Sequence, residues 1–103
     1  MNLRSRLVEL INALDELLCN VAMTGELREQ YLRQRALLSA MLDEVLRQKF
    51  DKHTGTYKVA VEQTNKAVKS AKRALRETEE REAVIQEITK AANAIDAVIK
   101  FAV

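Results

Sequence analysis

The last segment of the chain, from Thr56 to Ala102, contains neither glycine nor proline. It is rich in alanine, lysine, arginine and glutamate, which are among the strongest helix formers. Because a helix rises about 1.5 Å per residue, this segment would form one helix roughly 70 Å long. That is a long element for a chain of 103 residues, and it constrains how the preceding residues can pack.

The apolar face of this segment changes direction half-way along. On a helical wheel of about 100° per residue, the two halves have apolar stripes whose centres differ by about 140°. A left-handed supercoil would absorb roughly half of that difference. The first stripe contains Tyr57, Val61, Thr64, Val68, Ala71, Leu75 and Thr78, and the second contains Val84, Ile85, Ile88, Ala91, Ala92, Ile95, Val98, Ile99 and Ala102.

The change of face falls between Arg76 and Glu82, where no apolar side chain is present. In one structure that explains it, the helix is continuous or merely kinked, and its halves bury different faces against different partners. In the other, the helix breaks near Thr78, which caps a new helix with Glu79 and Glu80 in its first turn. The lack of glycine and proline disfavours a tight turn, so the continuous helix is the preferred expectation. A break would give a four-helix bundle.

The preceding residues predict a helical hairpin, with helices over about 2–22 and 26–51. Asn2 is a plausible N-cap of the first helix. Gly25 is the expected stop, either as the left-handed residue after that helix or as the cap of the next one. The second helix has so wide an apolar arc that we expect it to be the most buried. Thr54 or Thr56 can cap the long element, which covers about 56–102. The prediction is an all-α fold in one domain, residues 1–103, with the hairpin packed on the C-terminal element.

Composition supports a folded helical chain. The charged fraction is 31% and the hydrophobic fraction 48%, a balance typical of globular proteins rather than disordered ones. The single cysteine, Cys19, excludes an intrachain disulfide and favours a reducing compartment. No signal peptide is visible, and no run of about 18 apolar residues exists that would span a membrane. We expect a cytoplasmic protein.

A continuous C-terminal helix would have an uncovered half. The two N-terminal helices are too short to reach some 30 Å of it. Exposed apolar surface of that extent usually marks an interface, so we expect a homo-oligomer, most simply a dimer, or a protein partner. In that arrangement Ile95→Asp would disrupt the contact and leave the fold intact. The predicted interface residues are Ile85, Ile88, Ile95, Val98 and Ile99.

Charge is unevenly spread along the same segment, although the net charge is only +2. Residues 58–76 hold six basic side chains and one acidic, whereas residues 77–87 hold five acidic and one basic. Two copies packed antiparallel about a dyad near Arg76 would pair these blocks, and so would a hairpin broken at that point. A basic helix face also suits phosphate contact, which makes nucleic-acid-backbone binding the alternative function. That reading would use Lys66, Lys69, Arg73 and Arg76.

Catalytic, cofactor and metal motifs are missing from the sequence. His53 is the only histidine and is predicted to lie in a turn, without an orienting partner. Cys19 lies at the edge of an apolar helix face, which favours a small buried side chain over a nucleophile. We therefore expect no enzyme and no cofactor. The best-supported class is a non-enzymatic helical protein acting through protein–protein interaction, as adaptors, chaperones, immunity proteins and small regulators do.

Overall fold

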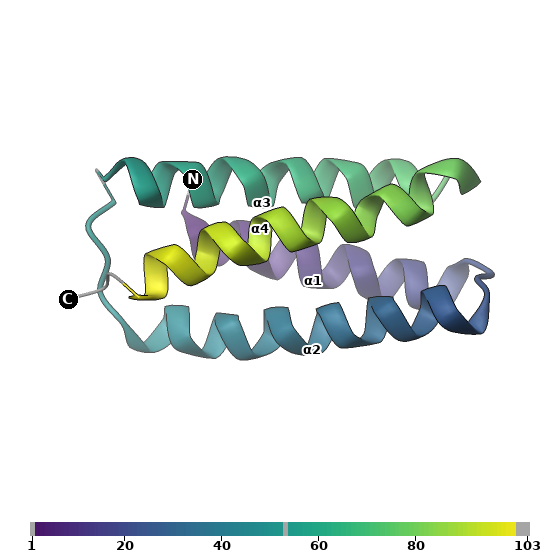
Figure 1. Ribbon diagram of the computed structural model, residues 1–103, viewed down its shortest axis with the longest axis horizontal. Helices are drawn as coiled ribbons and strands as arrows, with labels where there is room; N and C mark the ends of the chain where they lie inside the picture. The colour runs from purple at the N-terminus through teal and green to yellow at the C-terminus, as the bar shows by residue number, and fades with distance from the viewer. Residues whose placement is uncertain (1, 53, 101–103) are drawn as a thin grey trace.

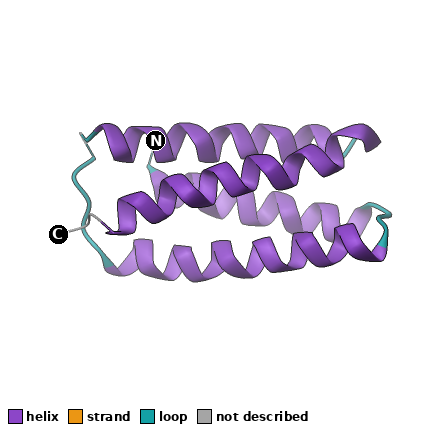
Figure 2. Ribbon diagram, in the orientation of Figure 1, coloured by secondary structure: helices purple, strands orange, loops and turns teal. Residues whose placement is uncertain are grey.

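The computed structural model describes residues 2–52 and 54–100. This part of the chain forms four α-helices, with loops and one short 3-10 turn between them (Figures 1 and 2). The long axis of the molecule is only 41 Å, against 19 and 17 Å across it. The elements are α1 (Leu3–Asn20), α2 (Gly25–Arg47), α3 (Gly55–Ala74), the 3-10 turn η1 (Thr78–Glu80) and α4 (Arg81–Lys100).

The four helices form a bundle in which each helix contacts two neighbours. α1 packs on α2 and α3, whereas α4 packs on α3 and α2, so α1 and α4 lie on one diagonal. The α3–α4 contact is the most extensive and α2–α4 the least. The predicted all-α fold is confirmed, with the C-terminal segment forming the second hairpin of a four-helix bundle.

The continuous C-terminal helix is the part of the preferred expectation that is wrong. α3 ends at Ala74, and Glu77 adopts an extended backbone with φ −116° and ψ 111° before the chain turns back. Any L-residue adopts this conformation, and no described residue has a positive φ. The turn therefore needs no glycine, which is why the absence of glycine did not prevent it. Thr78 begins η1, so the break lies where the sequence placed it.

Arg81 holds this turn in place. Its Nε donates to the carbonyl of Ala74 at the end of α3 over 3.2 Å, and its Nη1 donates to the carbonyl of Ala22 over 3.2 Å. The Tyr31 hydroxyl of α2 donates to the carbonyl of Arg81 itself over 2.6 Å. One residue at the start of α4 is thus bonded to α3, to the α1–α2 connection and to α2.

Side-chain caps set the starts of three helices. Asn2 accepts from the Ser5 backbone N–H, Thr24 from that of Leu27, and Thr54 from that of Tyr57. The caps at Asn2 and Thr54 were predicted from the sequence. Gly25 has no positive φ and is the first residue of α2, so it is neither a left-handed stop nor the cap; Thr24 provides the cap.

The second helix ends at Arg47, four residues before the predicted end. Gln48 has an extended backbone, and Phe50 packs against Tyr57, with ring centroids 6.3 Å apart. Tertiary packing of this aromatic pair therefore ends the helix where the local sequence contains no breaker. Residues 101 and 102, which the sequence assigned to the C-terminal element, and His53, which it assigned to a turn, lie outside the described part of the chain.

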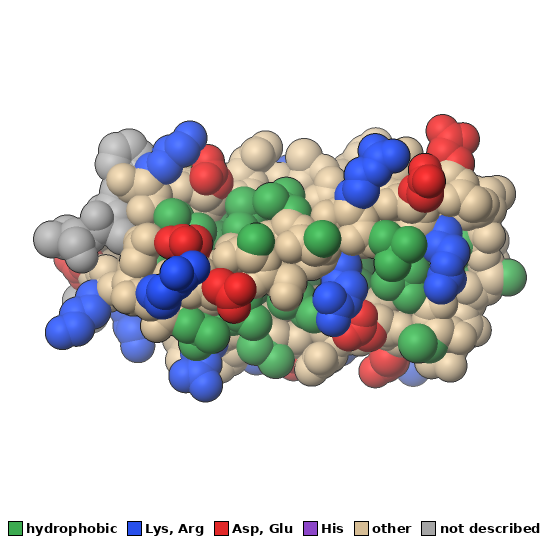
Figure 3. Space-filling model, turned by 90° about the horizontal axis from the view of Figure 1, so that it is seen from below, with side chains coloured by type: hydrophobic (Ala, Val, Ile, Leu, Met, Phe, Trp, Pro, Cys, Tyr) green, Lys and Arg blue, Asp and Glu red, His purple; other side chains and the backbone are tan. Residues whose placement is uncertain are grey.

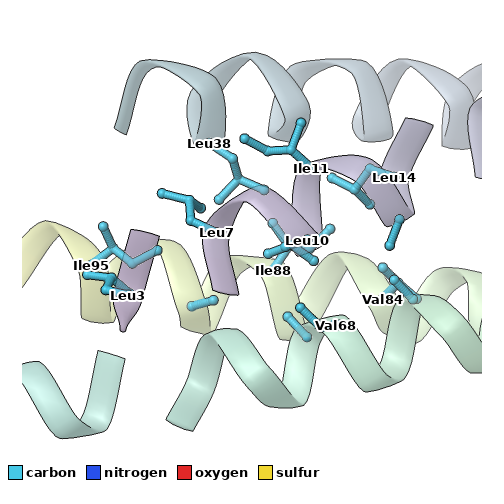
Figure 4. Packing of buried hydrophobic residues seen from close by; sticks show 14 of the residues in the cluster. Leu3, Leu7, Leu10, Ile11, Leu14, Leu38, Val68, Val84, Ile88 and Ile95 are labelled. Carbon is cyan, nitrogen blue, oxygen red and sulfur yellow. The ribbon is translucent and has the colours of Figure 1, made fainter. Parts of the chain in front are cut away.

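The core receives side chains from all four helices. In Figure 4, Leu7 and Leu10 of α1, Leu38 of α2 and Ile88 of α4 point into a common interior. α3 contributes small residues, which allow its neighbours to approach closely. The buried residues of α3 are Tyr57, Ala60, Thr64, Ala67, Val68, Ser70, Ala71 and Ala74.

Burial raises the pKa of Tyr31 to about 12, and the nearby Arg81 only partly opposes this. The folded chain keeps the phenolic proton to higher pH than the unfolded chain, which releases it near pH 10. Between those values the unfolded state binds fewer protons, so stability falls as pH rises.

We predict that the free energy of unfolding falls more steeply in the wild type than in Tyr31→Phe above about pH 10, by up to about 1.4 kcal/mol per pH unit. Below pH 10 the variant should be less stable by about 1 kcal/mol, since it loses the hydrogen bond to Arg81. Urea unfolding of both proteins across this range measures the difference. Parallel pH profiles would contradict the buried, bonded state of Tyr31.

Candidate interaction surface

The residues predicted to form an interface on the C-terminal element are directed into the bundle. Ile88, Ile95 and Val98 belong to the buried core, whereas Ile85 and Ile99 are half-buried and pack against it. The chain reversal at Glu77 is the physical reason, because it places this apolar face against the chain's own helices. The premise of an uncovered C-terminal half is therefore corrected.

The expected effect of Ile95→Asp changes with this placement. Ile95 has no exposed surface, so the substitution would bury an unpaired carboxylate and create a cavity. We now predict loss of the cooperative fold, measured as loss of helical circular dichroism at 25 °C. A folded variant with normal thermal stability would contradict the described packing of α4.

The most exposed apolar surface lies on α2. Only Tyr31, Leu38 and Val45 of this helix are buried, so α2 is the least buried of the four helices. The expectation from the sequence that it would be the most buried is wrong. Its neighbours α1 and α4 cover one side and leave the rest of the wide apolar arc open. The described residues include five exposed large hydrophobic side chains, of which three are on α2: Leu32 (47% exposed), Leu37 (43%) and Leu46 (53%).

These leucines flank an outward line of small and charged residues. The line repeats with spacings of four and three, which keeps its members on one side of a helix. In Figure 3 the molecule is seen from the side on which α2 lies in Figure 1, and apolar side chains gather there between basic and acidic ones. The members of the outward line are Glu29, Arg33, Ala36, Ala40, Asp43 and Arg47, all exposed.

Among the described residues, the ion pairs that involve this line are local and lie within α2. Arg33 lies 3.5 Å from Glu29, and Arg47 lies 3.0 Å from Glu44. Pairs of this exposed, intrahelical kind stabilise a helix by a few tenths of a kcal/mol at most. They are therefore easily rearranged when another charged surface approaches.

The inner side of α2 is fixed by polar contacts as well as by the core. Arg35 forms a two-point pair with Asp15 of α1, in which Nη2 and Oδ2 are 3.2 Å apart. Arg28 donates to the carbonyl of Leu18 over 2.9 Å and so caps the end of α1. These bonds hold α2 in one orientation and keep its outward line turned to solvent.

The four predicted nucleic-acid contacts are all exposed: Lys66, Lys69 and Arg73 on α3, and Arg76 in the turn. None of these four side chains forms an ion pair with another described residue. Within the described part of the chain, these four side chains therefore form no ion pair that joins the basic block of residues 58–76 to the acidic block of residues 77–87.

The uneven charge has a simpler origin in the helix termini. Lys72 and Arg73 lie in the last turn of α3, and Glu82 lies in the first turn of α4 just after the acidic η1. Basic residues near a helix C-terminus and acidic residues near an N-terminus both stabilise the helix dipole. Residues 72–82 thus carry the charge pattern of a helix end followed by a helix start.

Other chemically interesting groups do not assemble into a site. Cys19 is exposed, which corrects the expectation that it is buried. Open grooves between α2 and α4 bring Leu27, Ile85 and Glu82 together near the α1–α2 connection. Among the described residues, no group of three or more His, Cys, Asp or Glu side chains could hold a metal ion. In the same residues, no helix has the length and apolar character needed to cross a membrane.

Comparison with known proteins gives no match: no family model fits the sequence, and neither a curated protein nor a solved structure is significantly similar to it.

Two adjacent leucines of α2 provide a direct test of this surface. Leu38 is fully buried, so Leu38→Ala should lower the free energy of unfolding by about 2–5 kcal/mol. Leu37 is 43% exposed, so Leu37→Ala should change it by no more than about 0.5 kcal/mol. Chemical denaturation at low protein concentration measures both. Equal losses in the two variants would contradict the described orientation of α2.

Proposed function

We propose that this chain is a non-enzymatic helical-bundle protein that works by protein–protein interaction, including self-association. The observation that supports the proposal is the outward face of α2, where Leu32, Leu37 and Leu46 are about half exposed. Apolar side chains grouped on one helix and bordered by charges are typical of a surface that docks another protein. The proposed interface thus lies on α2 and not on the C-terminal element.

The rest of the bundle supports an interaction role over catalysis. Its described interior is filled with apolar side chains, with Thr64 and Ser70 as the buried polar residues. Thr64 donates its hydroxyl to the carbonyl of Ala60 over 2.7 Å, which satisfies it within its own helix. The buried hydroxyl of Thr64 thus takes part in the packing of α3, and the proposed function lies on the surface.

Site-specific photo-crosslinking in the producing cells tests the proposal. A photoreactive amino acid replacing Leu37 should crosslink to a protein, because this position lies on the apolar face of α2. The same group replacing Lys58, an exposed residue of α3, is the control. A crosslink to a second copy or to a different protein at position 37 alone supports the proposal. Equal or absent crosslinking at both positions would refute it.

A second candidate function is binding to a nucleic-acid backbone. The observation that favours it is a set of four exposed basic side chains that form no ion pair with another described residue: Lys66, Lys69, Arg73 and Arg76. Binding of this kind weakens steeply as salt concentration rises. Retention on DNA or RNA that falls with salt and is abolished by Lys69→Glu with Arg73→Glu would establish it. Retention unaffected by that double variant would exclude this surface.

A further inference from the structure

The outward face of α2 is complementary to itself when two copies run antiparallel. Pairing residue i of one copy with residue 76 − i of the other places Glu29 opposite Arg47 and Arg33 opposite Asp43. It also places Ala36 opposite Ala40, at the centre. Each of these residues occupies the four-three seam on which helices of a coiled coil meet. Opposite charges therefore face each other at four layers around one dyad, two on each side of the alanines.

The exposed leucines are covered in the same arrangement. Residues flanking an antiparallel seam meet flanking residues of the partner on the same side. On one side Leu37 of one copy lies beside Leu37 of the other, and on the opposite side Leu32 lies beside Leu46. All three exposed leucines of α2 thus receive an apolar neighbour. The small side chains of Ala36 and Ala40 allow the two helices to approach closely at the dyad.

The charges also select the direction of pairing. In a parallel, in-register pair each residue would face its own copy, so Glu29 would oppose Glu29 and Arg33 would oppose Arg33. Like charges placed opposite each other cost free energy, whereas the antiparallel pair has opposite charges at every charged layer. The local pairs Glu29–Arg33 and Glu44–Arg47 remain close enough to join the contacts across the dyad.

We propose that two copies of this chain form an antiparallel dimer through the outward face of α2, with the dyad at the level of Leu38. The inference rests on the proposed function and names its partner as a second copy. A C2 dimer is the commonest symmetry for such an interface. Because α2 is only about 35 Å long at about 1.5 Å per residue, the contact is narrow and the dimer should be concentration-dependent.

Charge reversal at one layer tests both the partner and the register. Arg33→Asp places two carboxylates opposite each other at the layer shared with Asp43, and Asp43→Arg places two guanidinium groups there. Each variant alone should weaken the dimer at least about tenfold. An equal mixture of the two variants should form a heterodimer. In that mixed pair each of the two layers has one acidic and one basic side chain, whereas either variant paired with itself has like charges at both layers. The double variant should dimerise like the wild type, because each layer again has one acid and one base.

Light scattering after size exclusion, from about 1 µM to about 1 mM, measures the mass of each protein. Both positions are exposed, and circular dichroism should show that every variant keeps its helices. Lys69→Asp, an exposed charge reversal on α3, is the matched control and should dimerise normally. A wild type that stays monomeric, single variants that still dimerise, or a double variant that stays monomeric would each overturn the proposal.

Crosslinking gives an independent reading of the register in a Cys19→Ser background. Leu37→Cys should be joined to a second copy by a short bis-maleimide. Leu32→Cys and Leu46→Cys should each fail alone and be joined to one another when mixed. A monomeric wild type combined with a photo-crosslink from position 37 to a different protein would overturn the dimer and leave the proposed function standing. A monomeric wild type with no photo-crosslink from position 37 would overturn the dimer and the proposed function together.

Discussion

The bundle depends on a mismatch of direction between the apolar stripes of α3 and α4. A continuous helix would leave one stripe facing water, and the chain avoids this by turning back at Glu77. Full burial of Val84, Ile88 and Ile95 in the resulting hairpin stabilises the fold by roughly 1.5–3 kcal/mol for each side chain. That gain outweighs the few helical hydrogen bonds lost at the turn. Arg81 replaces one of them by donating to the carbonyl of Ala74.

The small residues of α3 determine which helices pack most closely. Ala60, Ala67, Ala71 and Ala74 have no exposed surface, and they face the larger side chains of α1 and α4. α3 can therefore pack closely on both α1 and α4. α2 contributes to the core a single row of buried side chains, Tyr31, Leu38 and Val45. The seven-residue spacing of this row buries one line of α2 and leaves a second seam on its opposite side. The same packing that completes the core thus creates the exposed surface.

Periodicity and composition predicted the helices, the caps at Asn2 and Thr54 and the location of the break, because these depend on local side-chain patterns. They did not decide whether the chain turned at residues 75–77, since Glu77 can adopt an extended or a helical backbone and only tertiary burial selects one. The site was misplaced for the same reason. Ile88 and Ile95 belong to an interface if the helix continues through residues 75–77 and to the core if the chain turns there. The exposed part of the apolar arc of α2 can be identified only when its neighbours α1 and α4 are known.

The end of α2 and the state of Cys19 show a related limit. Phe50 leaves the helix to pack on Tyr57, a residue that belongs to the next helix, so the local sequence holds no signal for it. Cys19 lies at the edge of an apolar face, where a small rotation of the helix decides between burial and exposure. In both cases the outcome depends on a neighbour distant in sequence.

The separation between α3 and α4 within one chain tests the central claim of this account most directly. Spin labels at Glu62→Cys and Asn93→Cys, in a Cys19→Ser background diluted with unlabelled protein, report it by pulsed electron resonance; both positions are exposed. The chain reversal predicts a distance below about 25 Å, because packed helices lie about 8–10 Å apart. A distance near 46 Å, which a continuous helix rising about 1.5 Å per residue would give, would contradict it.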